Sequence, residues 1–351
     1  MIPYIFILFS LIILRLCKDD KIYCFLSSLL LILFAGCRGW HVGVDTSQYA
    51  YIFNALQGTD WKSIMLIRDS EEQASEIGYT FLCWLFGKFG DYNSFKLLSA
   101  GFTLAPAGFL IYKYSKNKCL SFVVFYLLPI CCQMSMTMMR QGYAFGFWLL
   151  ACHYMIQKKW KPYLAFIAIG ILFHSSLIVV SPLYLLNWLS YKRKYNILIL
   201  ILLVVIYTFK SILFLFLASY SRMQYEAGDA GGWFTLLYLI LLFLSTYFVK
   251  ETYLKSYINK LLIYFLITTI ALWFIGMNLA AVFRLAAYTE FFICLFVPNI
   301  YGSICNKNFS RCVIFACLVV GYLMFNSIIF RKHDIDSFVP YYFYWDKNEI
   351  V

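Results

Sequence analysis

Long apolar runs separated by short basic clusters dominate this sequence and limit what it can fold into. A helix that crosses a bilayer needs about 20 apolar residues, and we count about twelve runs that approach this length. The pattern predicts an all-α, polytopic integral membrane protein of about 12 transmembrane helices, with residues 1–351 as one transmembrane domain. The runs lie near residues 2–16, 22–37, 94–112, 119–137, 140–156, 161–174, 175–190, 196–218, 232–249, 260–277, 283–301 and 311–330.

Composition excludes the other classes of protein. Hydrophobic residues make up 63% of the chain and charged residues 13%, whereas a soluble domain has roughly 45–50% apolar and about 25% charged residues. Soluble enzymes, disordered chains, coiled coils and collagen are therefore excluded. The 12 cysteines include no CxxC pair and mostly lie inside apolar runs, so we interpret them as small core residues, not disulfide or zinc ligands.

The basic residues indicate which side of the membrane each loop occupies. Six clusters contain 17 of the 29 lysines and arginines, and the positive-inside rule assigns all six to the cytoplasm. The net charge of +12 is then an anchoring pattern, and nucleic acid is not an expected partner. The clusters are Arg15/Lys18/Lys21, Lys113/Lys116/Lys118, Lys158/Lys159/Lys161, Lys192/Arg193/Lys194, Lys250/Lys255/Lys260 and Lys307/Arg311.

Successive cytoplasmic clusters must be separated by an even number of crossings. This parity predicts that segment 76–90 is a re-entrant or interfacial helix, and that run 161–190 is a hairpin turning near His174. It also puts both termini outside, together with the polar loops 38–75 and 219–231 and the tail 331–351. The tail is rich in tyrosine and tryptophan, which weakly favours a carbohydrate partner because sugars stack on aromatic rings.

Three arginines fall at the outer ends of predicted helices: Arg38, Arg140 and Arg284. A charge at membrane depth is costly, so such a residue usually faces a water-filled cavity or a partner. Guanidinium groups fork onto phosphate oxygens, and three of them at one level favour a pyrophosphate ligand. The alternative is that each arginine snorkels to the interface or pairs with a carboxylate such as Glu290 or Asp45. Lys210 is a weaker candidate for the same reason.

Two further polar residues could take part in proton transfer. His174 lies at the predicted hairpin tip, and histidine titrates near neutral pH, so it could accept a proton from a sugar hydroxyl or simply form a turn hydrogen bond. Asp45 precedes Thr46 and Ser47 as a helix cap would, with Tyr49 and Phe53 on one face of that helix; it could also orient Arg38. No metal-binding or nucleotide-binding motif is present, so no cofactor and no metal are expected.

These residues resemble the signature of a known family. Arg38, Gly43, Asp45, Tyr49 and Phe53 follow the R-x(4)-G-x-D-x(3)-Y-x(3)-F pattern of the EpsG-like, Wzy-type polysaccharide polymerases. The resemblance extends in the family's order from about residue 38 to 290. Its later elements are Glu76-Ile77-Gly78-Tyr79, Met139-Arg140-Gln141, Phe173-His174-Ser175-Ser176 and Arg284-Leu285 with Tyr288.

The resemblance implies a GT-C-like, metal-independent glycosyltransferase in the bacterial inner membrane. Such enzymes join oligosaccharide repeat units carried on undecaprenyl diphosphate at the outer face; a chain-length regulator protein is a candidate partner. By resemblance, Arg38, Arg140 and Arg284 would bind the diphosphates, and His174 would be the base or orient the acceptor. Asp45 would orient Arg38 or the acceptor sugar. The supporting positions would be Tyr49, Gln141, Ser175 and Tyr288.

Other functions remain open at this point. A flippase for lipid-linked oligosaccharides also uses intramembrane arginines, although it should carry internal repeats and charges through the membrane depth. An O-antigen ligase should have a large outer loop between late spans, whereas loop 219–231 is short. A membrane acyltransferase should have an intramembrane histidine pair with an acid or amide, which this sequence lacks.

Overall fold

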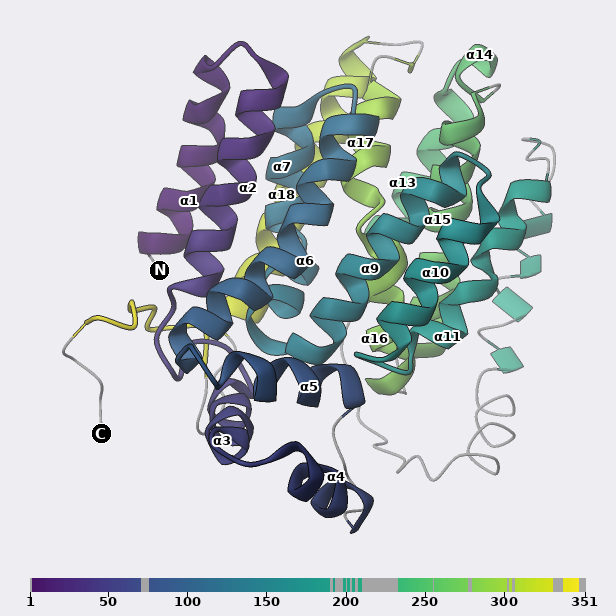
Figure 1. Cartoon of the computed structure of the whole chain (residues 1–351). Helices are drawn as coiled ribbons and strands as arrows, with labels where there is room; N and C mark the ends of the chain where they lie inside the picture. The colour runs from purple at the N-terminus through teal and green to yellow at the C-terminus, as the bar shows by residue number, and fades with distance from the viewer. Residues whose placement is uncertain are drawn as a thin grey trace. The chain divides into compact units, whose positions relative to one another are not determined.

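The computed structural model describes residues 2–70, 76–189, 192, 198–199, 201–202, 204–205, 208–209, 233–254, 256–276, 280–301, 303–304, 307–330 and 337–346 (Figure 1). Over these ranges the chain forms helices, turns and three isolated β-bridges. The prediction of an all-α fold is confirmed. The chain divides into two compact units, Met1–Ser181 with Leu323–Val351, and Pro182–Tyr322.

Several helices are suited to cross a membrane. Three are long and apolar enough, namely α6 (Tyr92–Tyr114), α15 (Tyr257–Gly276) and the stretch Lys307–Ser327 of α18 (Lys307–Ile329). Two bent helix pairs raise the number to five, one of them bent by 76° between Lys118–Leu127 and Pro129–Thr137. The chain is thus a helical membrane protein. A count of twelve crossings is not reached among the described residues and stays a prediction.

The first unit contains the N-terminal helices. In Figure 1, α1 and α2 lie side by side, and α5 runs crosswise to the longer α6 and α9. Besides α6, the helices are α1 (Ile2–Ile13), α2 (Asp20–Gly36), α3 (Thr46–Leu56), α4 (Trp61–Ser70), α5 (Ile77–Phe86), α7 (Lys118–Leu127), α8 (Pro129–Cys132), α9 (Met139–Ile156), α10 (Trp160–Ile171) and α11 (Leu177–Val180). A π-helical turn, Gln133–Thr137, leads from α8 toward α9.

Local chemistry determines where these helices begin and how closely they pack. Asp19, Asp91 and Asn117 are N-caps whose side chains accept hydrogen bonds from backbone N–H groups in the first turns of α2, α6 and α7. Gly146 of α9 lies against α6, where an added Cβ would come within 2.1 Å of the Phe102 carbonyl oxygen. Small residues of this kind let membrane helices approach closely.

The second unit contains α13 (Trp233–Ser245), α14 (Glu251–Leu254), α15, α16 (Ala280–Glu290), α17 (Ile293–Tyr301) and most of α18. Helix α15 packs on α16 and α17, and its Phe265 ring stacks on Phe292, which lies between those two helices, with centroids 3.9 Å apart. A hydrogen bond of 2.8 Å joins the hydroxyls of Thr269 and Thr289. This face of the unit is therefore a packed core.

The structure also tests the predicted loops. The polar segment 38–75 carries the helices α3 and α4, because Thr46–Leu56 and Trp61–Ser70 each present an apolar stripe. Segment 76–90 contains the ten-residue helix α5, and its position as a re-entrant or interfacial helix stays a prediction. A turn between α10 and α11 contains His174, where the hairpin was predicted. Loop 219–231 and Lys210 lie outside the described residues.

Candidate functional site

Arg140 lies in the first turn of α9, directly after the π-helical turn. Its Nη1 donates to Oε2 of Glu76 across 2.8 Å, and about a third of the arginine side chain (35%) is exposed. Glu76 is the residue immediately before α5, and its own side chain is 20% exposed. A semi-exposed guanidinium paired with a single carboxylate can still exchange that partner for another anion.

His174 approaches the same carboxylate from the turn between α10 and α11. Its Nδ1 lies 2.6 Å from Oε1 of Glu76, so the two oxygens of Glu76 are divided between the imidazole and the guanidinium. Burial on its own would raise the pKa of the Glu76 carboxyl, but the hydrogen bond with His174 and the charge of Arg140 outweigh burial and lower that pKa. Glu76 is therefore a carboxylate anion that pairs with the Arg140 guanidinium and the His174 imidazole.

Backbone hydrogen bonds fix the segments that carry Glu76 and His174 relative to each other. The Gly78 N–H donates to the Leu172 carbonyl across 2.8 Å, which ties the start of α5 to the end of α10. An added Cβ at Gly78 would lie 2.7 Å from that carbonyl oxygen, so a side chain would separate the two helices. The His174 N–H donates to the Gly170 carbonyl. The carboxylate and the imidazole thus come from two helix ends that are joined directly.

Tyr49 of α3 completes this cluster. Its hydroxyl interacts electrostatically with Arg140, and the ring packs edge-on against Tyr79 with centroids 5.7 Å apart. Burial raises the pKa of the Tyr49 hydroxyl, although Arg140 acts in the opposite direction. We call Arg140, Glu76, His174 and Tyr49 the outer cluster, because the predicted topology puts all four at the outer level.

Arg38 has a different environment. Its side chain is fully buried, and each of its three nitrogens donates to a backbone carbonyl: Nε to Val42 (3.0 Å), Nη1 to Ala35 (2.6 Å) and Nη2 to Met136 (2.8 Å). The Thr46 hydroxyl also donates to the Met136 carbonyl. Arg38 therefore joins the end of α2, the loop before α3 and the π-helical turn that precedes α9. We call this arrangement the Arg38 cage.

The C-terminal tail covers the Arg38 cage. Residues 337–346 run along segment 37–43, with backbone hydrogen bonds from Gly39 to Tyr342 and from Tyr344 to Cys37. Beneath the tail, the buried Lys96 donates to the Arg38 carbonyl, and its ammonium lies 5.8 Å from the centroid of the Tyr344 ring. The aromatic tail, predicted to favour a carbohydrate, is in this region part of the packing.

The remaining predicted residues are spread over both units. Asp45 is exposed at the start of α3, with a left-handed φ of 66° and no side-chain capping bond. Gln141 is buried beside Arg140, and Ser175 is exposed beside His174. In the second unit, Arg284 is exposed on α16 and Tyr288, one turn later, is fully buried.

Glu76 is the site residue that sequence reasoning did not single out. It appeared only as the first residue of a short motif, and its partners Arg140 and His174 are 64 and 98 positions away along the chain. The available signal was an acid at the start of an apolar segment, directly before a helix that was not expected to span the bilayer. Intramembrane or interfacial acids usually have a nearby cation.

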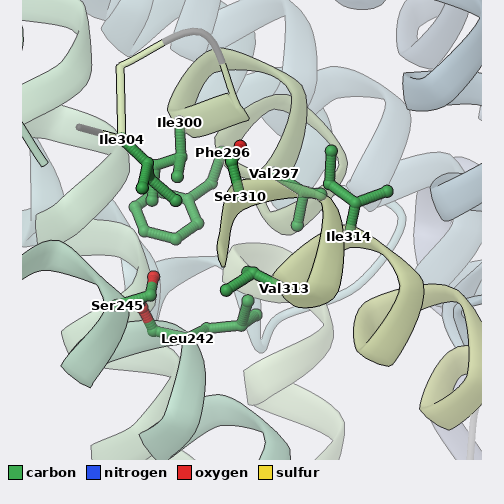
Figure 2. Close-up of a pocket in the computed structure, with 9 residues that line it drawn as sticks. All are labelled: Leu242, Ser245, Phe296, Val297, Ile300, Ile304, Ser310, Val313 and Ile314. Carbon is green, nitrogen blue, oxygen red and sulfur yellow. Dashed lines mark hydrogen bonds between the residues drawn. The ribbon is translucent and has the colours of Figure 1, made fainter. Parts of the chain in front are cut away.

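Two cavities outside the outer cluster do not suit a polar substrate. One, between α13, α17 and α18, has a volume of about 10 Å³, which is room for one water molecule (Figure 2). Its lining is almost wholly apolar apart from Ser245 and Ser310. The other, about 500 Å³, is an apolar groove between α1, α2 and the tail. Across the described residues, no three His, Cys, Asp or Glu side chains come together as a metal site.

Comparison with known proteins adds one finding. Residues 21–343 match the profile of the family described as the EpsG family. No protein with a curated description and no solved structure matches the chain.

Proposed function

Because the chain belongs to the EpsG family, we propose that it is a polysaccharide polymerase of the bacterial inner membrane. It joins oligosaccharide repeat units carried on undecaprenyl diphosphate, working at the outer face and without a metal. The observation that supports this proposal best is the outer cluster, in which a semi-exposed arginine and a histidine share one carboxylate. These are the two groups that glycosyl transfer from a lipid diphosphate requires.

In the proposed reaction, a hydroxyl oxygen of the incoming repeat unit attacks the anomeric carbon of the growing chain. The new glycosidic C–O bond forms as the bond between that carbon and the diphosphate oxygen breaks, and the lipid diphosphate leaves with the bonding electrons. The hydroxyl proton passes to His174. Because Nδ1 of His174 faces Glu76, Nε2 is the ring nitrogen that takes this proton.

Arg140 stabilises the departing diphosphate. Charge accumulates on the phosphate oxygens as the glycosidic bond breaks, and a fixed donor at that position lowers the barrier by roughly 2.7–4 kcal/mol. The guanidinium is exposed enough to reach a ligand, and the Tyr49 hydroxyl helps to orient it. Asp45, exposed one helical turn before Tyr49, is placed by this proposal toward the acceptor sugar.

The test is reconstitution of the purified protein with lipid-linked repeat units. We expect a ladder of longer products from the wild type and none from Arg140→Ala or His174→Ala. His41→Ala is the matched control, because it removes an exposed histidine on the loop before α3, whereas Glu76 forms its ion pairs with Arg140 and His174. Movement of lipid-linked units across the vesicle membrane without chain growth would instead indicate a flippase, and would reject the polymerase.

A further inference from the structure

The proposed function uses Arg140 and His174 but gives no role to Glu76, which lies between them. One carboxylate oxygen faces Nη1 of Arg140 at 2.8 Å, and the other faces Nδ1 of His174 at 2.6 Å. A carboxylate shared in this way divides its negative charge between two partners. The distribution of that charge therefore depends on what else each partner binds.

Only one of the two partners has a competing ligand in the proposed reaction. A diphosphate carries more charge than a carboxylate and accepts paired hydrogen bonds from a guanidinium, so it competes with Glu76 for Arg140. His174 has no such competitor, because an acceptor hydroxyl is neutral. When a diphosphate binds Arg140, the Glu76 carboxylate interacts mainly with the imidazole of His174. Its negative charge then stabilises the protonated imidazole more strongly.

We propose that Glu76 is a positioning residue that couples diphosphate binding at Arg140 to proton uptake by His174. With no lipid diphosphate present, Glu76 is shared and His174 is a weaker base. When the diphosphate engages Arg140, Glu76 turns to His174 alone and strengthens it as a base. The inference rests on the proposed function, and it predicts that the acceptor hydroxyl is deprotonated only after the glycosyl donor has bound.

The surroundings of His174 allow this coupling to be measured. The ionisable groups that face it or its direct partners are Glu76 before α5, Arg140 and Tyr143 on α9, and Tyr49 on α3. Tyr143 reaches the site only through its ring, which stacks on Phe173, while its hydroxyl is hydrogen-bonded to Ser99. The short helix α11, Leu177–Val180, brings no ionisable side chain. Glu76 is therefore the acid in direct contact with the imidazole among the described residues.

Glu76→Gln is the main test, since it keeps the shape of the side chain and removes its charge. We expect the variant to bind farnesyl diphosphate about two- to fivefold more tightly, because the Glu76 carboxylate no longer competes for Arg140. The effect is small because the Arg140–Glu76 pair is partly exposed to solvent. The turnover number should fall at least about tenfold, because His174 is a weaker base. The acid limb of the pH–rate profile should move to lower pH. Glu76→Asp should recover part of the turnover.

Asp60→Asn is the matched control for charge. Asp60 is an exposed acid that caps α4 through Ser63, so its neutralisation alters the outer surface without touching the outer cluster. This variant should keep the affinity, the turnover number and the acid limb of the wild type. Unchanged turnover and an unchanged acid limb in Glu76→Gln would overturn the coupling, as would weaker binding of farnesyl diphosphate.

A second measurement does not depend on turnover. The rate at which diethyl pyrocarbonate modifies His174 in the wild type should shift to higher pH when farnesyl diphosphate is bound, with His174→Ala as the background. In Glu76→Gln the negative charge of the ligand still shifts the pH dependence of modification, but Glu76 can no longer contribute. The ligand should therefore cause a larger shift in the wild type than in Glu76→Gln. Equal shifts overturn the coupling, whereas a wild type that never extends chains rejects the proposed function instead.

Discussion

The Arg38 cage and the outer cluster each contain an arginine at a predicted helix end, but the two arginines differ in their burial and in their hydrogen-bond acceptors. Arg38 is fully buried and donates from all three nitrogens to backbone carbonyls. Arg140 is about one-third exposed and pairs with a carboxylate and a tyrosine hydroxyl. The main difference between Arg38 and Arg140 is the type of acceptor: backbone carbonyls for Arg38 and a carboxylate for Arg140.

The difference has a physical basis. A buried carbonyl that loses its arginine is left with fewer donors than before, and the Ala35 carbonyl loses its side-chain donor, so Arg38 cannot leave its cage at low cost. A carboxylate that loses Arg140 keeps its second partner, His174, and Arg140 gains a diphosphate in exchange. Arg38 is thus suited to fix the position of the chain before α9, and Arg140 to bind and release a ligand.

The largest effect is expected from Arg38→Met compared with Arg140→Met. Losing Arg38 removes one donor from each of three buried carbonyls, of which those of Val42 and Met136 keep the shared Thr46 hydroxyl, and should lower the free energy of unfolding by roughly 2–4 kcal/mol. Losing Arg140 breaks a partly exposed pair, which should change that free energy by about 1 kcal/mol or less. Chain growth should nevertheless fall roughly 10²- to 10³-fold in Arg140→Met. Thermal unfolding in detergent, combined with product ladders, measures both quantities.

The opposite result would reject the assignment of a structural role to Arg38 and a ligand-binding role to Arg140. An Arg38→Met protein that melts like the wild type but has lost its affinity for farnesyl diphosphate would show that Arg38 contacts the ligand. Residual chain growth in Arg38→Met should instead follow the folded fraction.

How far the sequence predicts this site depends on the kind of contact. The all-α membrane class follows from apolar runs and is confirmed, and the turn that contains His174 follows from charge parity. The bend at Leu128–Pro129 shows why a count of runs does not count spans, because run 119–137 divides there into two short helices. Hydropathy records how many apolar residues are present and is insensitive to such breaks.

The same limit applies to individual residues. Arg38 and Arg140 look alike in sequence because the carbonyls that hold Arg38 belong to the backbone, and backbone acceptors have no sequence signature. Glu76 escaped notice because no local spacing rule joins it to partners 64 and 98 residues away. Tertiary packing brings these groups together, and a single sequence gives only their order.

A smaller effect should come from Gly39→Ala, which tests whether the tail belongs to the Arg38 cage. An added Cβ would lie 1.9 Å from a ring atom of Tyr342, so the tail must move away. We expect a loss of about 1–3 kcal/mol in unfolding free energy, typical of overpacking, and faster proteolysis of the tail. The double variant Gly39→Ala/Tyr342→Ala should melt closer to the wild type than Gly39→Ala does. A specific rise in KM with unchanged melting would instead show that this surface binds substrate.

Tyr49→Phe should have the smallest effect and gives the finest test of the outer cluster. The variant removes the hydroxyl that interacts with Arg140 but keeps the ring against Tyr79. One such interaction contributes about 1 kcal/mol, which corresponds to about a fivefold loss of affinity for farnesyl diphosphate. Melting should not change, because the ring packing remains. Tyr79→Phe is the control, since it removes a neighbouring hydroxyl that does not face Arg140. If both variants lose affinity equally, the Tyr49 hydroxyl does not orient Arg140. If only Tyr49→Phe loses it, the outer cluster binds the diphosphate through an arginine held in place from α3.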